Sequence, residues 1–336
     1  MPLVELSPSG LYCAQAGLHI DPWRPVDGAL ITHAHSDHAR SGCRRYLAHE
    51  HSVPFLKARL GRIQAQGFSY GSAFTVNGVR ISFHPAGHIP GSSQIRLEYR
   101  GEVWVVSGDY KTQADGISTP FEPVPCHVFI TESTFGLPLY RWRPQQEVFD
   151  EINDWWASNI ESETVSVIIA YSLGKSQRII QGIDRSTGPV IVHPSVADMN
   201  DVMHSISSTF PSTIRWSASL SPADFRNALV IVPPGAADAA WIERMKPYST
   251  AHVSGWMQLR GARRWQGVDR GFVLSDHADW PGLVSAVKAT GAEKVYVTHG
   301  YSDVFSKWLN GQGYDAQVLE TLFEGEGREV AEKNKG

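Results

Sequence analysis

The chain has 336 residues, of which 42% are hydrophobic and 19% are charged, and its formal net charge is −4. This length allows a sizeable core and one or two domains, and the net charge alone does not indicate a nucleic-acid binder. We expect a cytoplasmic protein without membrane spans or a secretory leader. No apolar run is long enough to cross a bilayer, and the three cysteines show no Cys-x-x-Cys spacing.

The first informative segment joins a short apolar strand to a cluster of histidines. Residues 29–31 lead directly into the sequence His-Ala-His-Ser-Asp-His at positions 33–38. Side chains two residues apart on an extended segment point the same way, so His33 and His35 can hold one metal while Asp37 and His38 reach a second. Imidazole and carboxylate are ligands that zinc accepts. The segment therefore predicts a metal centre at a strand end.

Three later strands are also predicted to end in side chains that can bind metal. One strand runs into the glycine-containing turn that carries His88, and the apolar strand over 103–106 is followed by Asp109. Near the other end of the chain, a strand over 295–298 leads to His299. Each of these residues alone could be an ordinary strand-end or turn residue, but together they complete a ligand set.

A long segment with alternating helix and strand patterns separates these groups. Residues 145–157 place apolar side chains on one helical stripe, and strand patterns recur at 165–170, 190–192 and 228–232. Strands that alternate with helices predict a parallel sheet with helices on its faces.

Two places in this segment are suited to phosphate contact. Ser172 and Lys175 lie in the turn after the strand at 165–170, where a helix is predicted to begin, and helix N-termini favour anions. The first glycine of a nucleotide-binding P-loop is missing, so we do not expect a nucleoside triphosphate here. Arg260 follows a Ser-Gly-Trp turn, and its planar guanidinium suits bidentate phosphate contact. We predict these three residues to bind substrate.

The motif at 33–38 resembles the His-x-His-x-Asp-His signature of the metallo-β-lactamase fold, and His88, Asp109 and His299 match its later motifs. The resemblance implies an α/β protein with an αββα sandwich and two metal ions about 3.5–4 Å apart that activate a hydroxide. Zinc is the expected metal, and manganese is the alternative. By the same resemblance the first metal is held by His33, His35, His88 and Asp109, and the second by Asp37, His38, His299 and Asp109.

Three further segments resemble the A, B and C motifs of the β-CASP branch of this fold, which contains nucleases. They are Thr131-Glu132-Ser133, the Ser-Asp-His-Ala-Asp sequence at 275–279, and residues 297–300. The resemblance implies that His277 is the general acid that protonates the leaving oxygen and that Glu132 orients it. An imidazole with a pKa of about 6.5 supplies a proton at neutral pH. A histidine at this motif B position is shared with RNA-processing members of the branch.

The motif positions also predict the domain organisation. A β-CASP-like α/β cap over 141–270 interrupts a metallo-β-lactamase domain made of 1–140 and 271–325, and a flexible tail follows at 326–336. Most of the chain resembles the bacterial DNA ligase-associated exonucleases, which implies a DNA exonuclease in DNA repair that is associated with a DNA ligase.

Three alternatives remain open. An RNA-processing ribonuclease is the alternative that motif B allows. A small-ester hydrolase would share the metals but would not need Glu132, His277 or the inserted segment. A non-catalytic binding subunit is disfavoured because all seven ligand positions are filled.

Overall fold

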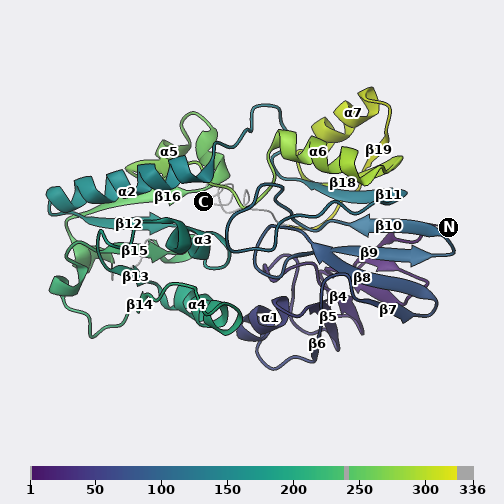
Figure 1. The fold of residues 1–336 in the computed structure, drawn as a ribbon, viewed down its shortest axis with the longest axis horizontal. Helices are drawn as coiled ribbons and strands as arrows, with labels where there is room; N and C mark the ends of the chain where they lie inside the picture. Colours follow the sequence, from purple (N-terminus) through teal and green to yellow (C-terminus); the bar gives the residue numbers. More distant parts are fainter. Residues whose placement is uncertain (1, 238–241, 324–336) are drawn as a thin grey trace. The chain divides into compact units, whose positions relative to one another are not determined.

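The computed structural model describes residues 2–237 and 242–323. The chain divides into two compact units (Figure 1), the first made of residues 1–141 and 277–336 and the second of 142–276. The predicted flexible tail at 326–336 lies outside the described residues. In the described parts of the chain, no helix combines the length and apolar character that a membrane span requires.

The first unit contains two β-sheets. Six strands form one sheet in the order β1-β2-β3-β4-β5-β6, and seven form the other in the order β19-β18-β11-β10-β9-β8-β7. The strands of the first sheet, β1 to β6, span Glu5–Ser7, Gly10–Cys13, Leu18–Ile20, Ala29–Leu30, Tyr46–His49 and Ala65–Phe68. In the second sheet, β7 to β11 span Ala73–Val76, Val79–Pro85, Ser93–Tyr99, Glu102–Val106 and Val128–Ser133, and β18 and β19 span Lys294–Gly300 and Asp315–Val318.

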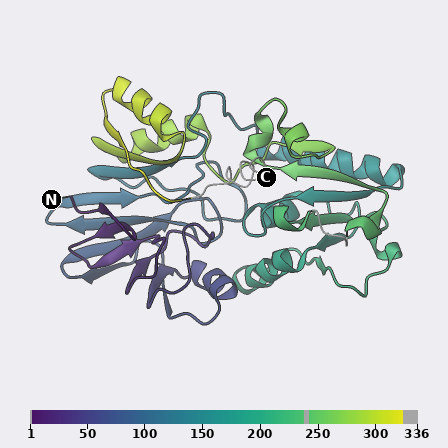
Figure 2. The ribbon, with the colours of Figure 1, turned by 180° about the vertical axis from the view of Figure 1, so that it is seen from behind.

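Three α-helices accompany these sheets. Helix α1 (Ser52–Leu60) contacts β5 and β6, α6 (Trp280–Thr290) contacts β11, and α7 (Ser302–Gly311) contacts β18 and β19. Figures 1 and 2 show α6 and α7 together beside β18, on the outer side of the second sheet. The predicted mixed α/β class is confirmed.

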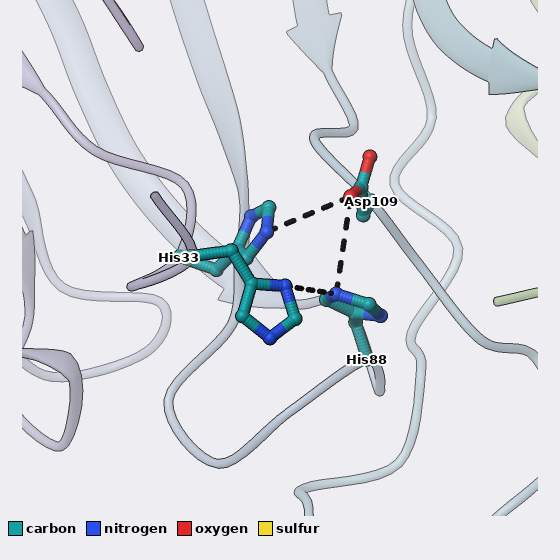
Figure 3. A group of neighbouring side chains, drawn as sticks. His33, His88 and Asp109 are labelled. Carbon is teal, nitrogen blue, oxygen red and sulfur yellow. Dashed lines mark hydrogen bonds and ion pairs between the residues drawn. The ribbon is translucent and has the colours of Figure 1, made fainter. Parts of the chain in front are cut away.

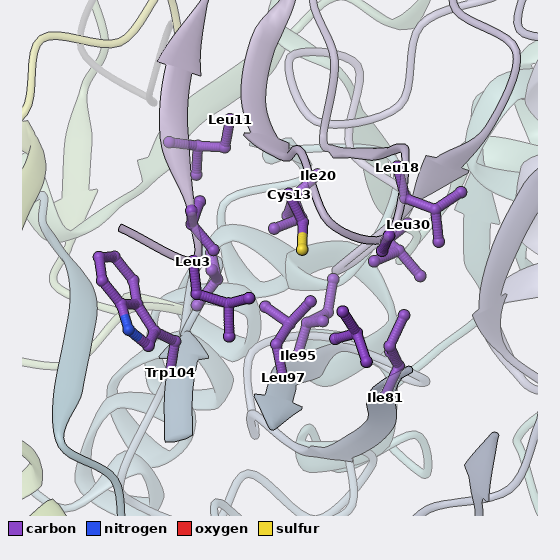
Figure 4. Packing of buried hydrophobic residues seen from close by; sticks show 14 of the residues in the cluster. Leu3, Leu11, Cys13, Leu18, Ile20, Leu30, Ile81, Ile95, Leu97 and Trp104 are labelled. Carbon is purple, nitrogen blue, oxygen red and sulfur yellow. The ribbon is translucent and has the colours of Figure 1, made fainter. Parts of the chain in front are cut away.

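Side chains alternate between the two faces along each strand of the second sheet, and apolar residues on both faces explain why both are covered. In β10, Trp104 and Val106 belong to the core shared with the first sheet, whereas Val103 and Val105 belong to the core shared with α6 and α7. Successive side chains of a strand point to opposite faces, so the apolar run of β10 supplies both cores. Figure 4 shows Trp104 in the same core as Leu11 of the first sheet and Ile95 and Leu97 of the second. Each such buried side chain contributes about 1.5–3 kcal/mol of transfer free energy.

The second unit is built on a parallel sheet of six strands in the order β14-β13-β15-β12-β16-β17. Its strands β12 to β17 span Val165–Ile169, Val190–Val192, Ile214–Arg215, Leu229–Val232, Tyr248–Val253 and Arg270–Phe272. Its helices α2 to α5 span Gln145–Glu161, Lys175–Gly182, Pro194–Ile206 and Ala262–Trp265, with short 3₁₀ turns at Pro222–Phe225, Pro234–Ala236, Ile242–Met245 and Gly255–Gln258. The parallel sheet with helices that the sequence predicts is confirmed. Helix α2 continues past the predicted end at 157, and it buries Val148, Ile152 and Trp156 on one stripe.

Candidate metal centre

The first unit brings six of the seven predicted metal ligands together, whereas Asp37 belongs to none of the groups among the described residues that could hold a metal. The atoms that could bind metal lie within 4.8 Å of one another in four overlapping groups. Asp109 belongs to three of these groups, which is the position expected for a bridging carboxylate. The groups are His33, His35, His88 and Asp109; Asp21, His33 and His38; His38, Asp109 and His299; and Asp109, Glu132 and His277.

The first predicted metal position is outlined by three imidazoles and Asp109. Figure 3 shows the rings of His33 and His88 directed at the Asp109 carboxylate. Their Nε2 atoms lie 3.6 and 3.8 Å from Asp109 Oδ2, and His88 Nε2 lies 3.1 Å from His35 Nδ1. His33 and His88 are fully buried, so these nitrogens point inward and not to solvent.

The second predicted position lies on the other side of the same carboxylate. His38 Nε2 lies 3.4 Å from Asp109 Oδ2 and 3.6 Å from Asp37 Oδ2. His299 Nδ1 lies 3.2 Å from Asp109 Oδ1. Two of the predicted ligands, His38 and His299, therefore lie next to Asp109. The third, Asp37, lies next to His38.

Unsatisfied nitrogens indicate that a cation belongs in this cluster. The Nε2 atoms of His33, His38 and His299 are buried, and none of them has a hydrogen-bond partner within the described part of the chain. Burying such an atom without a partner costs about 1–3 kcal/mol, so three at one place are unusual. Two ligands of one tetrahedral zinc ion, each at about 2.0–2.1 Å, stand about 3.3 Å apart. The observed separations of 3.1 to 3.8 Å match that spacing, so the residues fit a metal.

The electrostatics of the cluster agree with this interpretation. Burial, with the nearby charge of His38, holds the pKa of His33 well below its usual range and keeps it a neutral ligand. Burial also opposes a charge on His38, but the carboxylates of Asp109 and Asp37 outweigh it and hold the pKa of His38 well above the usual range. A divalent cation would satisfy the same carboxylates and release that proton.

Asp21 contacts His38 directly and is linked to His33 through Thr32, a role that the sequence motifs do not indicate. It follows β3, its carboxylate lies 2.8 Å from His38 Nδ1, and it accepts a hydrogen bond from the Thr32 N–H at 2.8 Å. Thr32 Oγ1 in turn lies 3.0 Å from His33 Nδ1. Such contacts fix which imidazole nitrogen faces the metal. The signal was a carboxylate at a strand end, the same signal that identified Asp109.

A bulge at the end of β18 directs His299 into the cluster. Glu132 pairs with Thr298 and Ser133 pairs with Gly300, so His299 is the extra residue of β18. His299 has a φ of +63°, which is uncommon for a residue other than glycine. Gly300 follows with a φ of +71°, and a Cβ there would lie 2.5 Å from the Ser133 carbonyl oxygen. The turn therefore requires glycine.

Glu132 and His277 form a buried pair next to Asp109. His277 Nδ1 lies 2.9 and 3.0 Å from the two oxygens of Glu132. The same carboxylate accepts hydrogen bonds from the backbone N–H of Tyr110 at 2.8 Å and of Thr134 at 3.2 Å. A carboxylate held by this many donors is fixed in place, and it orients the His277 ring.

The three predicted substrate-binding residues lie in the second unit. Ser172 Oγ is 3.0 Å from Ser195 Oγ, and Arg260 is exposed. Lys175 is fully buried, and its ammonium lies 3.5 Å from Asp276 Oδ2 and 5.1 Å from the centre of the Tyr171 ring. Their role in phosphate binding stays a prediction.

Comparison with known proteins gives relatives of two kinds, and no family model matches the chain. A probable DNA ligase from Opitutus terrae is 30% identical over 92% of this chain and 30% of its own length. RNase aCSPSF2 from Saccharolobus solfataricus is 26% identical over 37% of this chain and 25% of its own length. Cleavage and polyadenylation specificity factor subunit 3 from Dictyostelium discoideum is 28% identical over 32% of this chain and 14% of its own length. The chain therefore spans less than a third of each of these relatives.

A solved structure supports the fold. The crystal structure of a protein of unknown function from Enterococcus faecalis V583 matches with a TM-score of 0.55 and 9% identity, over 80% of this chain and 74% of that one. At this identity the likeness concerns the fold alone. The relatives above imply the metallo-β-lactamase fold that the sequence motifs predict. The likeness to these relatives supports the resemblance to β-CASP-type metallo-β-lactamase-fold nucleases that the sequence motifs indicate.

Proposed function

We propose that this chain is a metal-dependent nuclease that hydrolyses phosphodiester bonds of DNA. The observation that carries the proposal is the Glu132–His277 pair, whose metal-binding atoms share a group with Asp109. Hydrolysis of a phosphodiester needs both an activated water and a proton for the departing oxygen. A hydrolase of small activated esters needs only the first.

Two divalent metal ions are the cofactors in this proposal. The first position uses His33, His35, His88 and Asp109, and the second uses Asp37, His38, His299 and Asp109. When bound, such ions lower the pKa of a bound water and stabilise charge at phosphorus. The imidazole-rich donor set favours zinc, and manganese is the alternative.

The protein's own groups supply the proton. His277 Nδ1 faces Glu132, so Nε2 is the nitrogen that donates to the leaving oxygen. The Glu132 carboxylate favours the charged imidazolium and fixes the ring plane. Asp37 is the third catalytic residue of the proposal. Its carboxylate oxygen Oδ2 lies 3.6 Å from His38 Nε2, at the second metal position.

The inserted segment, over the predicted range 141–270, serves in this proposal as a β-CASP-like cap that binds the nucleic-acid backbone. Ligands of open parallel sheets gather outside the carboxyl ends of the strands. Ser172 and Lys175 follow the carboxyl end of β12, and Arg260 lies between the carboxyl end of β16 and β17. We assign backbone phosphates to Ser172 and Arg260, whereas Lys175, which is fully buried beside Asp276, holds the turn in place.

DNA is the favoured substrate, and exonucleolytic action in DNA repair is the favoured activity. Support comes from the alignment to a probable DNA ligase, which extends over 92% of the chain. The alignments to the RNase and to the cleavage factor extend over 37% and 32%. The ligase likeness also supports a functional association with a DNA ligase. An RNA-processing ribonuclease is the second candidate, because His277 occupies motif B and five further matches carry the name endoribonuclease.

Digestion of end-labelled oligonucleotides tests these assignments. Single- and double-stranded DNA and RNA of one sequence are incubated with the zinc- or manganese-loaded protein, beside a thioester. We expect cleavage of DNA with release of short products from an end. Cleavage of RNA alone would favour the second candidate. Thioester hydrolysis without cleavage of any oligonucleotide would overturn the proposal.

A further inference from the structure

The segment that follows β19 returns to the candidate metal centre. The Leu319 N–H donates a hydrogen bond to the Val297 carbonyl at 2.9 Å, so the segment starts beside β18. Leu319 is partly buried and packs against the core between the two sheets. The backbone of this segment is therefore anchored a few residues before it reaches Phe323.

Phe323 stacks on a predicted metal ligand. Its ring centre lies 4.5 Å from that of His38, and the two planes differ by 7°. The ring meets Trp23 edge-on at 5.9 Å and lies 6.1 Å from the ring of His299. Its neighbour Leu322 is 59% exposed and contributes to no such contact among the described residues.

Phe323 also lines a small hollow at the second predicted metal position. The hollow is shared with Asp21, His38, Asp109 and His299 and has a volume of about 10 Å³. That is room for about one water molecule. Within the first unit, an aromatic side chain therefore closes the space next to the unpartnered Nε2 atoms of His38 and His299.

His38 is consequently held in two different ways. Its Nδ1 edge is fixed by the Asp21 carboxylate at 2.8 Å, and one face of its ring is covered by Phe323. The hydrogen bond sets which nitrogen faces the metal, whereas the stacked ring restricts tilting and excludes water from the ligand.

We propose that Phe323 is a positioning residue of the second metal position, which keeps the His38 imidazole oriented and slows release of the metal bound there. The inference rests on the two-metal centre of the proposed function, and it does not depend on the substrate. Phe323 stacks on His38 and lies beside His299, and both are ligands of this second position. The effect should therefore fall on one metal of the two.

Release of zinc to a coloured chelator measures this difference. Protein loaded with two equivalents of zinc is mixed with excess 4-(2-pyridylazo)resorcinol, and the release of each equivalent is followed by absorbance. Loss of an aromatic stack is worth about 0.5–1.5 kcal/mol, so Phe323→Ala should speed release of one equivalent about 2- to 12-fold. The other equivalent should leave at the wild-type rate. Phe323→Leu, which keeps the bulk without a planar ring, should give a smaller acceleration.

Leu322→Ala is the matched control, because Leu322 precedes Phe323 and is mostly exposed. It should release both metals at the wild-type rate. Unchanged release from both Phe323 variants would overturn the inference, and so would equal acceleration by Leu322→Ala. Wild-type protein that binds no zinc would overturn the metal centre itself, which separates that failure from failure of the role of Phe323.

Discussion

Both units of this protein have buried polar side chains at strand ends. The interactions that satisfy these side chains differ between the two units. In the first unit, the Nε2 atoms of His33, His38 and His299 are buried without hydrogen-bond partners around Asp109. In the second unit, the buried cations Lys175 and Arg178 lie 3.5 and 3.3 Å from the two oxygens of the Asp276 carboxylate. The cluster of the first unit leaves positive charge to be supplied by a metal. In the second unit, the side chains of Lys175 and Arg178 supply the positive charge.

This difference separates a binding site from a structural network. A buried polar group costs free energy unless it is paired, so convergent unpaired acceptors indicate a ligand. A paired network indicates a role in holding the chain in place. Among the described residues, every group that could hold a metal lies in the first unit. Variants in each unit can therefore break or sharpen the comparison.

The largest effect is expected from Asp109→Ala. Asp109 contacts His33, His38, His88 and His299, so its removal takes a ligand from both predicted metal positions. We expect loss of most of both metal equivalents and of all measurable nuclease activity. Mass spectrometry of the purified protein measures the metal content. Asp276→Ala is the control: it removes a buried carboxylate of the second unit and should keep both metal equivalents. Full metal occupancy in Asp109→Ala would disprove the role of Asp109 as a ligand shared by both metals.

His277→Ala should lose catalysis while it keeps the metals. His277 lies outside both predicted ligand sets, and general-acid catalysis is typically worth about 10²–10⁴-fold in rate. The loss should be smaller on a nitrophenyl phosphodiester, because that leaving group departs without a proton. The measurement is the ratio of wild-type to variant rates on the oligonucleotide and on the activated diester.

Glu132→Gln gives a graded version of the same experiment. The amide keeps the size of the side chain but removes the charge that favours imidazolium, so we expect the pattern of His277→Ala at smaller amplitude. Metal content is determined in parallel for both variants. Equal losses on the two substrates with both metals intact would mean that His277 binds the scissile phosphate and does not donate a proton. Loss of metal would make it a ligand.

In the second unit, Asp276→Ala should destabilise the protein instead of emptying a site. Removing one partner of a buried ion pair leaves charge uncompensated and typically costs about 3–5 kcal/mol. Urea unfolding followed by circular dichroism measures the loss. Arg215→Ala is the control, because Arg215 is 43% exposed and its pairs with Asp198 and Asp201 are at the surface. Such exposed pairs contribute about 0–1 kcal/mol. Equal losses in the two variants would refute the distinction.

Much of the first unit could be predicted because its ligands follow apolar strands of characteristic length. The pattern placed His88, Asp109 and His299 at strand ends, and the fold brings those ends together. Asp21 was missed as a site residue because its role depends on contacts with Thr32 and His38 across the sheet. Phe323 was missed because a single aromatic residue after the last strand has no local signature; its partners lie far away in the sequence.

The sequence predicts the fold class of the second unit but not its network of buried ion pairs. Alternating strand and helix patterns gave the parallel sheet, which depends on periodicity alone. The turn that carries Lys175 was expected to face phosphate, yet the side chain is fully buried beside Asp276, a residue about a hundred positions later. Pairing over that distance is set by the tertiary fold, and no local pattern reports it.

The smallest expected effect concerns acid stability and involves one histidine in each unit, the buried His49 and the half-buried His252. Burial, aided by the neighbouring His51, lowers the pKa of His49 to about 4, while Glu50 acts in the opposite direction. Burial and the charge of Lys175 lower the pKa of His252 to about 4 as well. Both rings are therefore neutral in the folded protein at pH 7. His49 is 2% exposed, and its ring stacks on Tyr70 at 3.6 Å.

Because the folded-state pKa of His49 lies below the value of about 6.5 in an unfolded chain, the unfolded state binds more protons between these values. The stability that neutral His49 provides is thus complete above pH 6.5 and is lost as the pH falls toward 4, with a total of about 1–3 kcal/mol. His49→Gln should flatten the decline of the free energy of unfolding over this range, measured by urea titrations at half-unit steps. His252→Gln should flatten it over the same range, because the pKa of His252 is lowered to about 4 as well. An unchanged slope in His49→Gln would show that other carboxylates and histidines dominate acid unfolding.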